Sequence, residues 1–129
     1  MSKFIVVLRP SETLLIDCSG LSDKFISDDL FRRLKAFCGF KYAESVCTVL
    51  PRVSFCCDEV GKMMEPLGDG NPNASQLYGN PFDTIIGDVF CFSPFFDEMA
   101  FLSYADITAL FSFLAVDEFQ QISVEDVPI

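Results

Sequence analysis

The side chains of this chain that could do chemistry are carboxylates and thiols, because its 129 residues include no histidine. Without an imidazole, neither a Ser–His nor a Cys–His nucleophile can be assembled. Glycoside hydrolysis needs two acids that face each other across a cleft, and neighbours in sequence rarely do so. The carboxylates here occur as the adjacent pairs Asp28-Asp29, Asp58-Glu59, Asp97-Glu98, Asp117-Glu118 and Glu125-Asp126. No calcium-loop spacing is present either, so we interpret the pairs as solvated acids and predict no catalytic residue.

The cysteines are predicted to be reduced and buried. They are Cys18, Cys38, Cys47, Cys56, Cys57 and Cys91. A disulfide framework is the first alternative, but it needs an oxidising compartment that nothing in the sequence indicates. A zinc site is the second alternative, but there is no C-x-x-C spacing, and the adjacent Cys56 and Cys57 would point to opposite faces of a strand. We therefore expect no metal and no cofactor.

Two segments could be taken for anion-binding sites. Residues 68–73 read Gly-Asp-Gly-Asn-Pro-Asn, which has glycines but no lysine, and Asp69 would oppose a phosphate. The basic cluster of Arg32, Arg33 and Lys35 fits an exposed helix face that keeps the domain in solution. We expect both segments to be structural.

Charge is distributed unevenly along the chain. Residues 1–62 hold nine bases and eight acids, whereas residues 63–129 hold eleven acids and no base, and the net charge is −10. A surface drawn from the second half would repel nucleic acid and anionic lipid and attract a basic protein. No apolar run approaches the roughly 20 residues that span a bilayer, and residues 1–10 lack the features of a secretory signal. We expect no nucleic acid, no membrane and a cytoplasmic location.

The strands that would position these residues belong to one α+β domain, residues 1–129, with a mixed or mainly antiparallel sheet. Apolar runs at 3–9 and 13–17 predict a β-hairpin, the first strand being covered on both faces. Residues 41–50, 52–57 and 82–92 are expected to be further strands. The turn at residues 58–61, directly after the run 52–57, predicts a hairpin whose second strand begins near residue 62.

Two amphipathic helices are expected to pack on this sheet. Ser27 can cap the first, and Gly39 is a natural left-handed residue at its end. Ser103 and Asp106 form a variant of the capping box at the start of the second. Around residues 73–78 the sequence fits either an ordered loop or a short helix. Residues 117–129 fit either a frayed acidic tail or a last strand.

Phenylalanine supplies the candidate interaction surface, because fifteen Phe side chains are many for one small core. The run from Phe90 to Phe96 either caps the core or leaves its last two rings exposed for self-association or for a partner. The acidic pair Asp97-Glu98 follows these rings directly, and Asp117-Glu118 is a further acidic pair of the second half. The candidate interaction surface comprises Phe95, Phe96, Asp97, Glu98, Asp117 and Glu118.

Several short motifs occur in a characteristic order. They are a turn at 58–62 (Asp-Glu-Val-Gly-Lys), a Pro/Asn loop at 71–80, a strand at 83–87 (Asp-Thr-Ile-Ile-Gly) and a closing helix that begins at Leu102-Ser103. In this order the chain resembles a small uncharacterised family of bacterial, phage and mobile-element proteins. The resemblance covers most of residues 3–114, and it implies no catalytic residue, since none is defined for that family. The high Phe content and the acid-only second half depart from the family pattern.

Three functional hypotheses follow. The first is a non-enzymatic cytoplasmic accessory protein, derived from a phage or mobile element, whose acidic face binds a basic protein. A sharper form of it is a DNA mimic, in which carboxylates stand in for phosphates and inhibit a nucleic-acid-binding protein. The third is a small-ligand-binding or enzymatic domain with a Phe-lined pocket around Asp83, Asp88 and Tyr78.

Overall fold

The centre of the fold is a hairpin of β1 (Phe4–Leu8) and β2 (Thr13–Asp17) in the computed structural model, which describes residues 2–61 and 68–128. The strands pair antiparallel, from Phe4 opposite Asp17 to Leu8 opposite Thr13. Residues 5–8 have no exposed surface, because side chains cover both faces of the sheet. The unbroken apolar run therefore encodes a central strand, as predicted.

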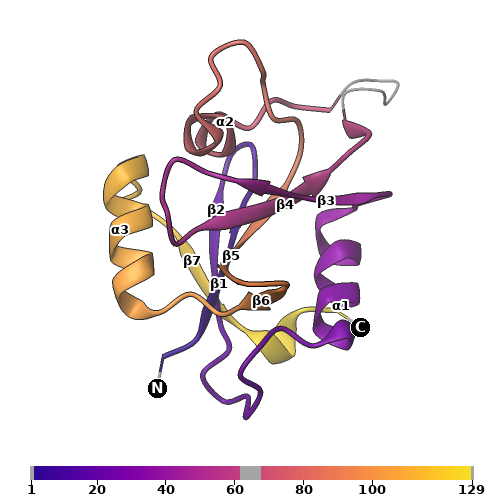
Figure 1. Cartoon of the computed structure of the whole chain (residues 1–129), viewed down its shortest axis with the longest axis vertical. Helices are drawn as coiled ribbons and strands as arrows, with labels where there is room; N and C mark the ends of the chain where they lie inside the picture. Colours follow the sequence, from indigo (N-terminus) through magenta and orange to yellow (C-terminus); the bar gives the residue numbers. More distant parts are fainter. Residues whose placement is uncertain (1, 62–67, 129) are drawn as a thin grey trace.

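The remaining strands extend this hairpin on both sides (Figure 1). They are β3 (Ala43–Cys47), β4 (Ser54–Asp58), β5 (Val89–Phe95), β6 (Glu98–Ala100) and β7 (Gln120–Ser123). Within the described residues the strand order is β3-β4-β5-β1-β2-β7, with β6 paired to β5 outside this path. Only β7 joins its neighbour, β2, in parallel among these pairings. The predicted α+β class with a mainly antiparallel sheet is confirmed.

The first predicted helix is α1 (Asp28–Cys38), and both of its ends are as predicted. The Ser27 hydroxyl accepts a hydrogen bond from the Leu30 backbone N–H at 3.1 Å. Gly39 ends the helix in the left-handed region, with a φ of +74°. Leu30 and Leu34 are buried on its inner face, as helical spacing requires.

The second predicted helix is α3 (Tyr104–Leu114), which begins with a reciprocal capping box. The Asp106 backbone N–H donates to the Ser103 hydroxyl at 3.1 Å, and the Ser103 backbone N–H donates to the Asp106 carboxylate at 2.9 Å. The same carboxylate accepts from Arg52 Nε at 2.9 Å. A third helix, α2, spans Pro72–Tyr78. Of the two alternatives given for this segment, an ordered loop or a short helix, the structure has the helix.

The charge of Asp106 is expected to stabilise the fold in a pH-dependent way. Burial opposes ionisation, but hydrogen bonds from Arg52 and Ser103 outweigh it and lower the pKa of the Asp106 carboxyl group. Because the folded pKa is depressed, this stability is fully present above the unfolded value of 3.8 and is lost as the pH falls through the folded value. Asp106→Asn is expected to lower the free energy of unfolding by about 1–2 kcal/mol at neutral pH.

Urea unfolding across a pH series measures this effect. The difference between the parent protein and Asp106→Asn is expected to narrow below about pH 4. Asp97→Asn, at an exposed turn, is the control and is expected to change stability by less than about 0.5 kcal/mol. If the difference in the free energy of unfolding between the two proteins stays constant down to low pH, the charge of Asp106 does not have the assigned role.

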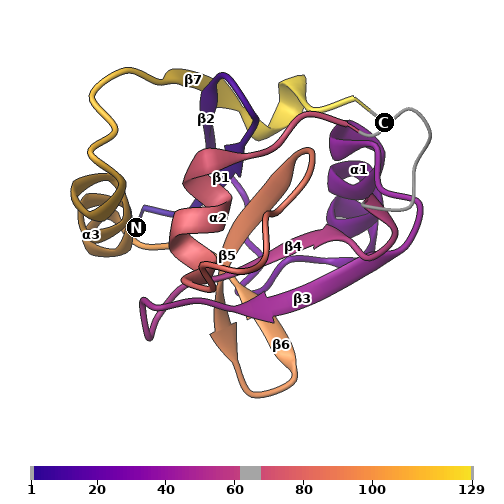
Figure 2. The same cartoon turned by 90° about the horizontal axis from the view of Figure 1, so that it is seen from above.

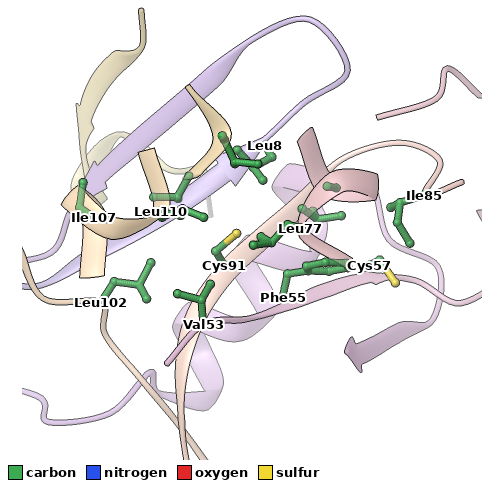
Figure 3. Close-up of a cluster of buried hydrophobic side chains, with 14 of the residues drawn as sticks. Leu8, Val53, Phe55, Cys57, Leu77, Ile85, Cys91, Leu102, Ile107 and Leu110 are labelled. Atoms are coloured by element: carbon green, nitrogen blue, oxygen red, sulfur yellow. The ribbon is translucent and has the colours of Figure 1, made fainter. Parts of the chain in front are cut away.

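The two faces of the sheet carry separate hydrophobic clusters. One cluster packs α2 and α3 against the sheet through side chains such as Leu77 and Leu110 (Figure 3). The other packs α1 against the opposite face through Leu30 and Leu34. Figure 1 shows α1 and α3 on either side of the strands. As predicted, Cys56 and Cys57 point to opposite faces and join different clusters.

The predicted strand at 82–92 is wrong over its first half, because β5 begins only at Val89. Gly87 has a φ of +81°, which interrupts the extended path. The preceding residues turn toward the loop before α2: the Gly87 N–H donates to Asp69 O at 2.9 Å, and the Asn71 N–H donates to Ile85 O at 2.8 Å. Backbone contacts to this loop therefore replace the expected strand pairing. The return leg predicted near residue 62 lies outside the described residues.

The C-terminal segment packs on the domain. Of the two alternatives left open, the last strand is present as β7, and a short 3₁₀ turn at Val124–Asp126 follows it. Val124 and Val127 are buried. Arg33 Nη2 donates to the carbonyl oxygens of both valines. The interpretation of the basic cluster as an exposed helix face is therefore wrong for Arg33, which holds this segment against α1.

Candidate functional site

The hairpin of β5 and β6 carries Phe95 and Phe96, the two aromatic residues of the predicted interaction surface. Its strands pair Ser93 with Ala100 and Phe95 with Glu98, so Phe96 and Asp97 form the turn. Figure 2 shows this hairpin projecting from the body of the sheet. Phe95 is 47% exposed and Phe96 is 93% exposed. Of the two alternatives left open for this run, a cap on the core or exposed rings, the structure has the exposed rings.

Aromatic contacts support one side of the hairpin tip. The ring centroids of Phe25 and Phe95 lie 5.7 Å apart, and those of Phe95 and Phe96 lie 5.0 Å apart with planes at 89°. Lys24 Nζ lies 5.4 Å from the Phe25 centroid and 5.6 Å from the Phe95 centroid. The Ile26 N–H donates to Met99 O at 2.8 Å, which fastens β6 to this segment. The inner rings are thus supported, while Phe96 faces solvent.

Phe96 also has a strained backbone, with a φ of +54°. In this region the β-carbon of an L-residue crowds the carbonyl oxygen, at a cost of about 1–2 kcal/mol, so glycine or asparagine usually occupies such a position. A bulky side chain here is a feature that clusters at binding sites. Phe96 thus combines strain with exposure, and neither contributes to the core.

A groove lies beside the hairpin tip and has a volume of about 280 Å³. Residues 45–47 of β3 line one side, and residues 96–99 of the hairpin line the other. Ser54 and Phe92 lie between them in the sheet. We call this surface the edge groove. Among the residues that the structure describes, its lining includes Asp97 and Glu98 and no basic residue, so it combines apolar surface with negative charge.

The structure separates Asp117 and Glu118 from the rest of the predicted surface. Together with Arg9, both line a different hollow of about 330 Å³, which lies at the C-terminal end of β1, next to Leu8. β5 runs antiparallel to β1, and Val89 is opposite Leu8. The hairpin tip therefore lies beyond the other end of β1, and the prediction that these six residues form one surface is wrong.

The acids of the second half also do not form one electronegative patch. Asp88 Oδ2 lies 3.1 Å from Arg9 Nε, and Asp106 Oδ1 lies 2.9 Å from Arg52 Nε. Bases of the first half thus neutralise two of the acids, and others lie at opposite ends of the sheet. A DNA mimic needs a continuous row of carboxylates, so this arrangement does not favour that hypothesis.

The thiols are all free, but the expectation that all are buried is wrong. Cys47 is exposed on the edge strand β3, and Cys38 is only half-buried. Burial raises the pKa of Cys18 to about 12 and those of Cys56 and Cys57 to about 11. Across residues 2–61 and 68–128, no cluster of acidic and cysteine side chains has the makings of a metal site. The buried thiols therefore act as small core residues.

The hypothetical pocket around Asp83, Asp88 and Tyr78 is not present as one cavity. Asp83 lines a hollow with Asp58 and Glu59, whereas Asp88 lines another hollow beside Gly87. The Tyr78 ring packs edge-on against Phe55 in the core, with centroids 6.4 Å apart. These three side chains therefore do not converge on a ligand.

Sequence reasoning missed half of the edge groove. The contribution of residues 45–47 depends on β3 being an edge strand. The support from Lys24 and Phe25 comes from the segment between β2 and α1, for which no strand or helix was predicted. The positive φ of Phe96 has no sequence signal, because glycine and asparagine are absent from that turn.

Comparisons of this chain with protein-family models, with curated proteins and with solved structures find no match. The resemblance to the bacterial and phage family therefore stays a prediction. Among the described residues, no helix has the length and apolar character needed to cross a membrane.

Proposed function

We propose that this protein is a non-enzymatic binding module that captures a basic segment of another protein at the edge groove. The observation that carries the proposal is Phe96, which is 93% exposed and has a φ of +54°. In the free protein the Phe96 ring contacts only the Phe95 ring among the described aromatic pairs, and most of its surface stays exposed. A partner that covers the ring would supply the burial that the fold does not.

Basic side chains fit this surface for two reasons. Lys24 already stacks on Phe25 and Phe95, and the outer ring, Phe96, offers the same kind of cation–π contact to a partner. Asp97 and Glu98 lie in the same groove, and the described residues that line it include no base. Lysine or arginine from a partner would therefore meet both an aromatic ring and a carboxylate.

A second copy of this chain fits the groove less well than a basic partner. Each copy would bring its own Asp97 and Glu98 together with a net charge of −10. Like charges across an interface oppose association. Exposed phenylalanines could still drive self-association, and sedimentation of the protein at low and high salt measures that outcome.

The proposal is tested with Phe96→Gly and a labelled synthetic peptide of alternating lysine and valine. The variant is expected to weaken peptide binding by about tenfold or more, because the exposed ring is lost. It is not expected to lower the thermal midpoint, because glycine accepts a positive φ without strain. Fluorescence anisotropy measures binding, and calorimetry measures the midpoint.

Phe82→Gly is the matched control, since Phe82 is 97% exposed and does not line the edge groove. It is expected to leave peptide affinity within about twofold of the parent value. A peptide with glutamate in place of lysine is expected not to bind. Equal affinity of the parent protein and Phe96→Gly would overturn the proposal.

A further inference from the structure

The edge groove borders a free edge of the sheet. β3 is the last strand in the order and pairs only with β4 among the described residues. The Glu59 N–H donates to Tyr42 O at 2.8 Å, so these two residues form a hydrogen-bonded pair of the antiparallel ladder. Hydrogen-bonded pairs alternate along such a ladder. The outward N–H and C=O groups therefore belong to Ala43, Ser45 and Cys47.

Natural edge strands are protected by lysine or another charged side chain, by proline, by a bulge, by shortness or by a covering segment. Of these, β3 has one charged side chain, Glu44, and a length of five residues; it contains no lysine and no proline, and no described strand pairs with its outer edge. β3 reads Ala-Glu-Ser-Val-Cys, and Glu44, Ser45 and Cys47 are exposed. Its side chains at 45 and 47 line the edge groove opposite Phe96. An exposed backbone edge and the aromatic hairpin tip thus face the same hollow.

We infer that the partner binds by strand addition, as an extended segment that pairs with β3; this inference rests on the proposed function. Main-chain hydrogen bonds supply affinity in this mode, and alternate side chains supply specificity. Every second side chain of the added strand would lie on the same face as Ser45 and Cys47. There it would meet the apolar and acidic lining of the groove, which includes Phe96 and Asp97.

The chemistry of the groove defines the occupant as a segment of alternating apolar and basic residues. The basic side chains, which share one face of such a strand, would lie over the groove, where Phe92 and Phe96 offer rings and Asp97 and Glu98 offer carboxylates. The apolar side chains would lie on the other face, beside Val46. A second copy would instead add Glu44 to the acids already present. The partner is therefore a basic β-forming segment of a different protein.

Ser45→Pro tests strand addition within the protein. Proline removes the outward N–H of residue 45, and it leaves the backbone hydrogen bonds between β3 and β4 in place because that N–H does not face β4. It also removes the contact between Ser45 Oγ and Cys56 Sγ at 3.4 Å, which the alanine control removes as well. The variant is expected to bind the lysine–valine peptide about tenfold or more weakly. Ser45→Ala retains the N–H and is expected to bind within about twofold of the parent protein.

A second measurement needs no variant of the protein. The same peptide, N-methylated at alternate residues on one edge, has lost the donors that a strand would offer to β3. When the methyl groups are on the edge that pairs with β3, the peptide is expected to bind the parent protein about tenfold or more weakly than the unmodified peptide. Methylation of the other edge is expected to have little effect.

The outcomes separate the binding mode from the proposed function. If Phe96→Gly weakens binding while Ser45→Pro and both methylated peptides leave it unchanged, strand addition is overturned and the groove remains the binding surface. If the strand tests weaken binding and Phe96→Gly does not, strand addition stands and the role of the hairpin tip fails. Absence of peptide binding at millimolar concentration would overturn the inference.

Discussion

Replacing Asn71 with aspartate is expected to lower the free energy of unfolding by about 3–5 kcal/mol, a large part of the stability of a typical domain. Asn71 has no exposed surface. Its Nδ2 donates to Leu8 O and to Gly87 O, each at 2.8 Å, and its Oδ1 accepts from the Ala74 N–H at 3.1 Å. One side chain thus joins the end of β1, the start of α2 and the segment before β5.

An aspartate at position 71 would have the same shape but no donors. Its charge would be buried against the carbonyl oxygens of Leu8 and Gly87, so two attractions would become repulsions. Urea denaturation at neutral pH measures the loss. Asn80→Asp is the matched control: Asn80 is exposed and its Oδ1 accepts from the Phe82 N–H, which a carboxylate can also do. A loss below about 1 kcal/mol for Asn71→Asp would contradict the assigned role.

The second large effect is expected at Phe90, which is fully buried in the cluster under α1. Its ring centroid lies 6.0 Å from those of Phe31 and Phe40 and 6.3 Å from that of Phe92. Phe90→Ala is expected to cost about 3–5 kcal/mol, because the removed ring leaves a cavity that its neighbours fill only in part. Thermal and urea unfolding measure the cost.

Phe82→Ala provides the comparison for Phe90→Ala, since it removes the same ring from a side chain that is 97% exposed. Its effect on stability is expected to stay within about 0.5 kcal/mol. Similar losses for both variants would show that the ring of Phe90 is not a packing centre. Binding of the lysine–valine peptide is expected to survive Phe82→Ala, which keeps the stability series separate from the binding series.

Local sequence signals predicted the parts of the fold whose causes are local. Ser27 and Ser103 fixed the starts of α1 and α3, because a capping hydroxyl and the apolar stripe after it lie within one or two turns. The strands β1 and β4 were predicted from their apolar runs. These features need no knowledge of the rest of the chain.

The errors fall where distant residues decide the structure. The segment before Val89 has strand-like composition, but its backbone bonds to Asp69 and Asn71 turn it away from the sheet. β6 and β7 were not predicted as strands outright, because Glu98–Ala100 is short and Gln120–Ser123 is polar. Both become strands through pairing with a neighbour.

The candidate site could be predicted only in part for the same reason. The excess of phenylalanine over the available core raised exposed rings at Phe95 and Phe96 as one alternative, but it could not exclude that these rings cap the core. Asp117 and Asp97 were grouped because both belong to the acid-only half of the chain. A shared charge pattern does not show which residues are close in space, and the two lie beyond opposite ends of β1. The acidic count likewise could not reveal that Arg9 and Arg52 pair with Asp88 and Asp106.

The position of the first hairpin in the sheet has a consequence for synthesis on the ribosome. β1 pairs with β5, and β2 pairs with β7, so the flanking partners of the hairpin are encoded near the other end of the chain. Pairings between residues so far apart in sequence form slowly. The apolar hairpin therefore emerges before both of its flanking strands, and its two edges stay unpaired until Val89–Phe95 and then Gln120–Ser123 have been translated, which makes it a segment of the nascent chain that a chaperone would shield.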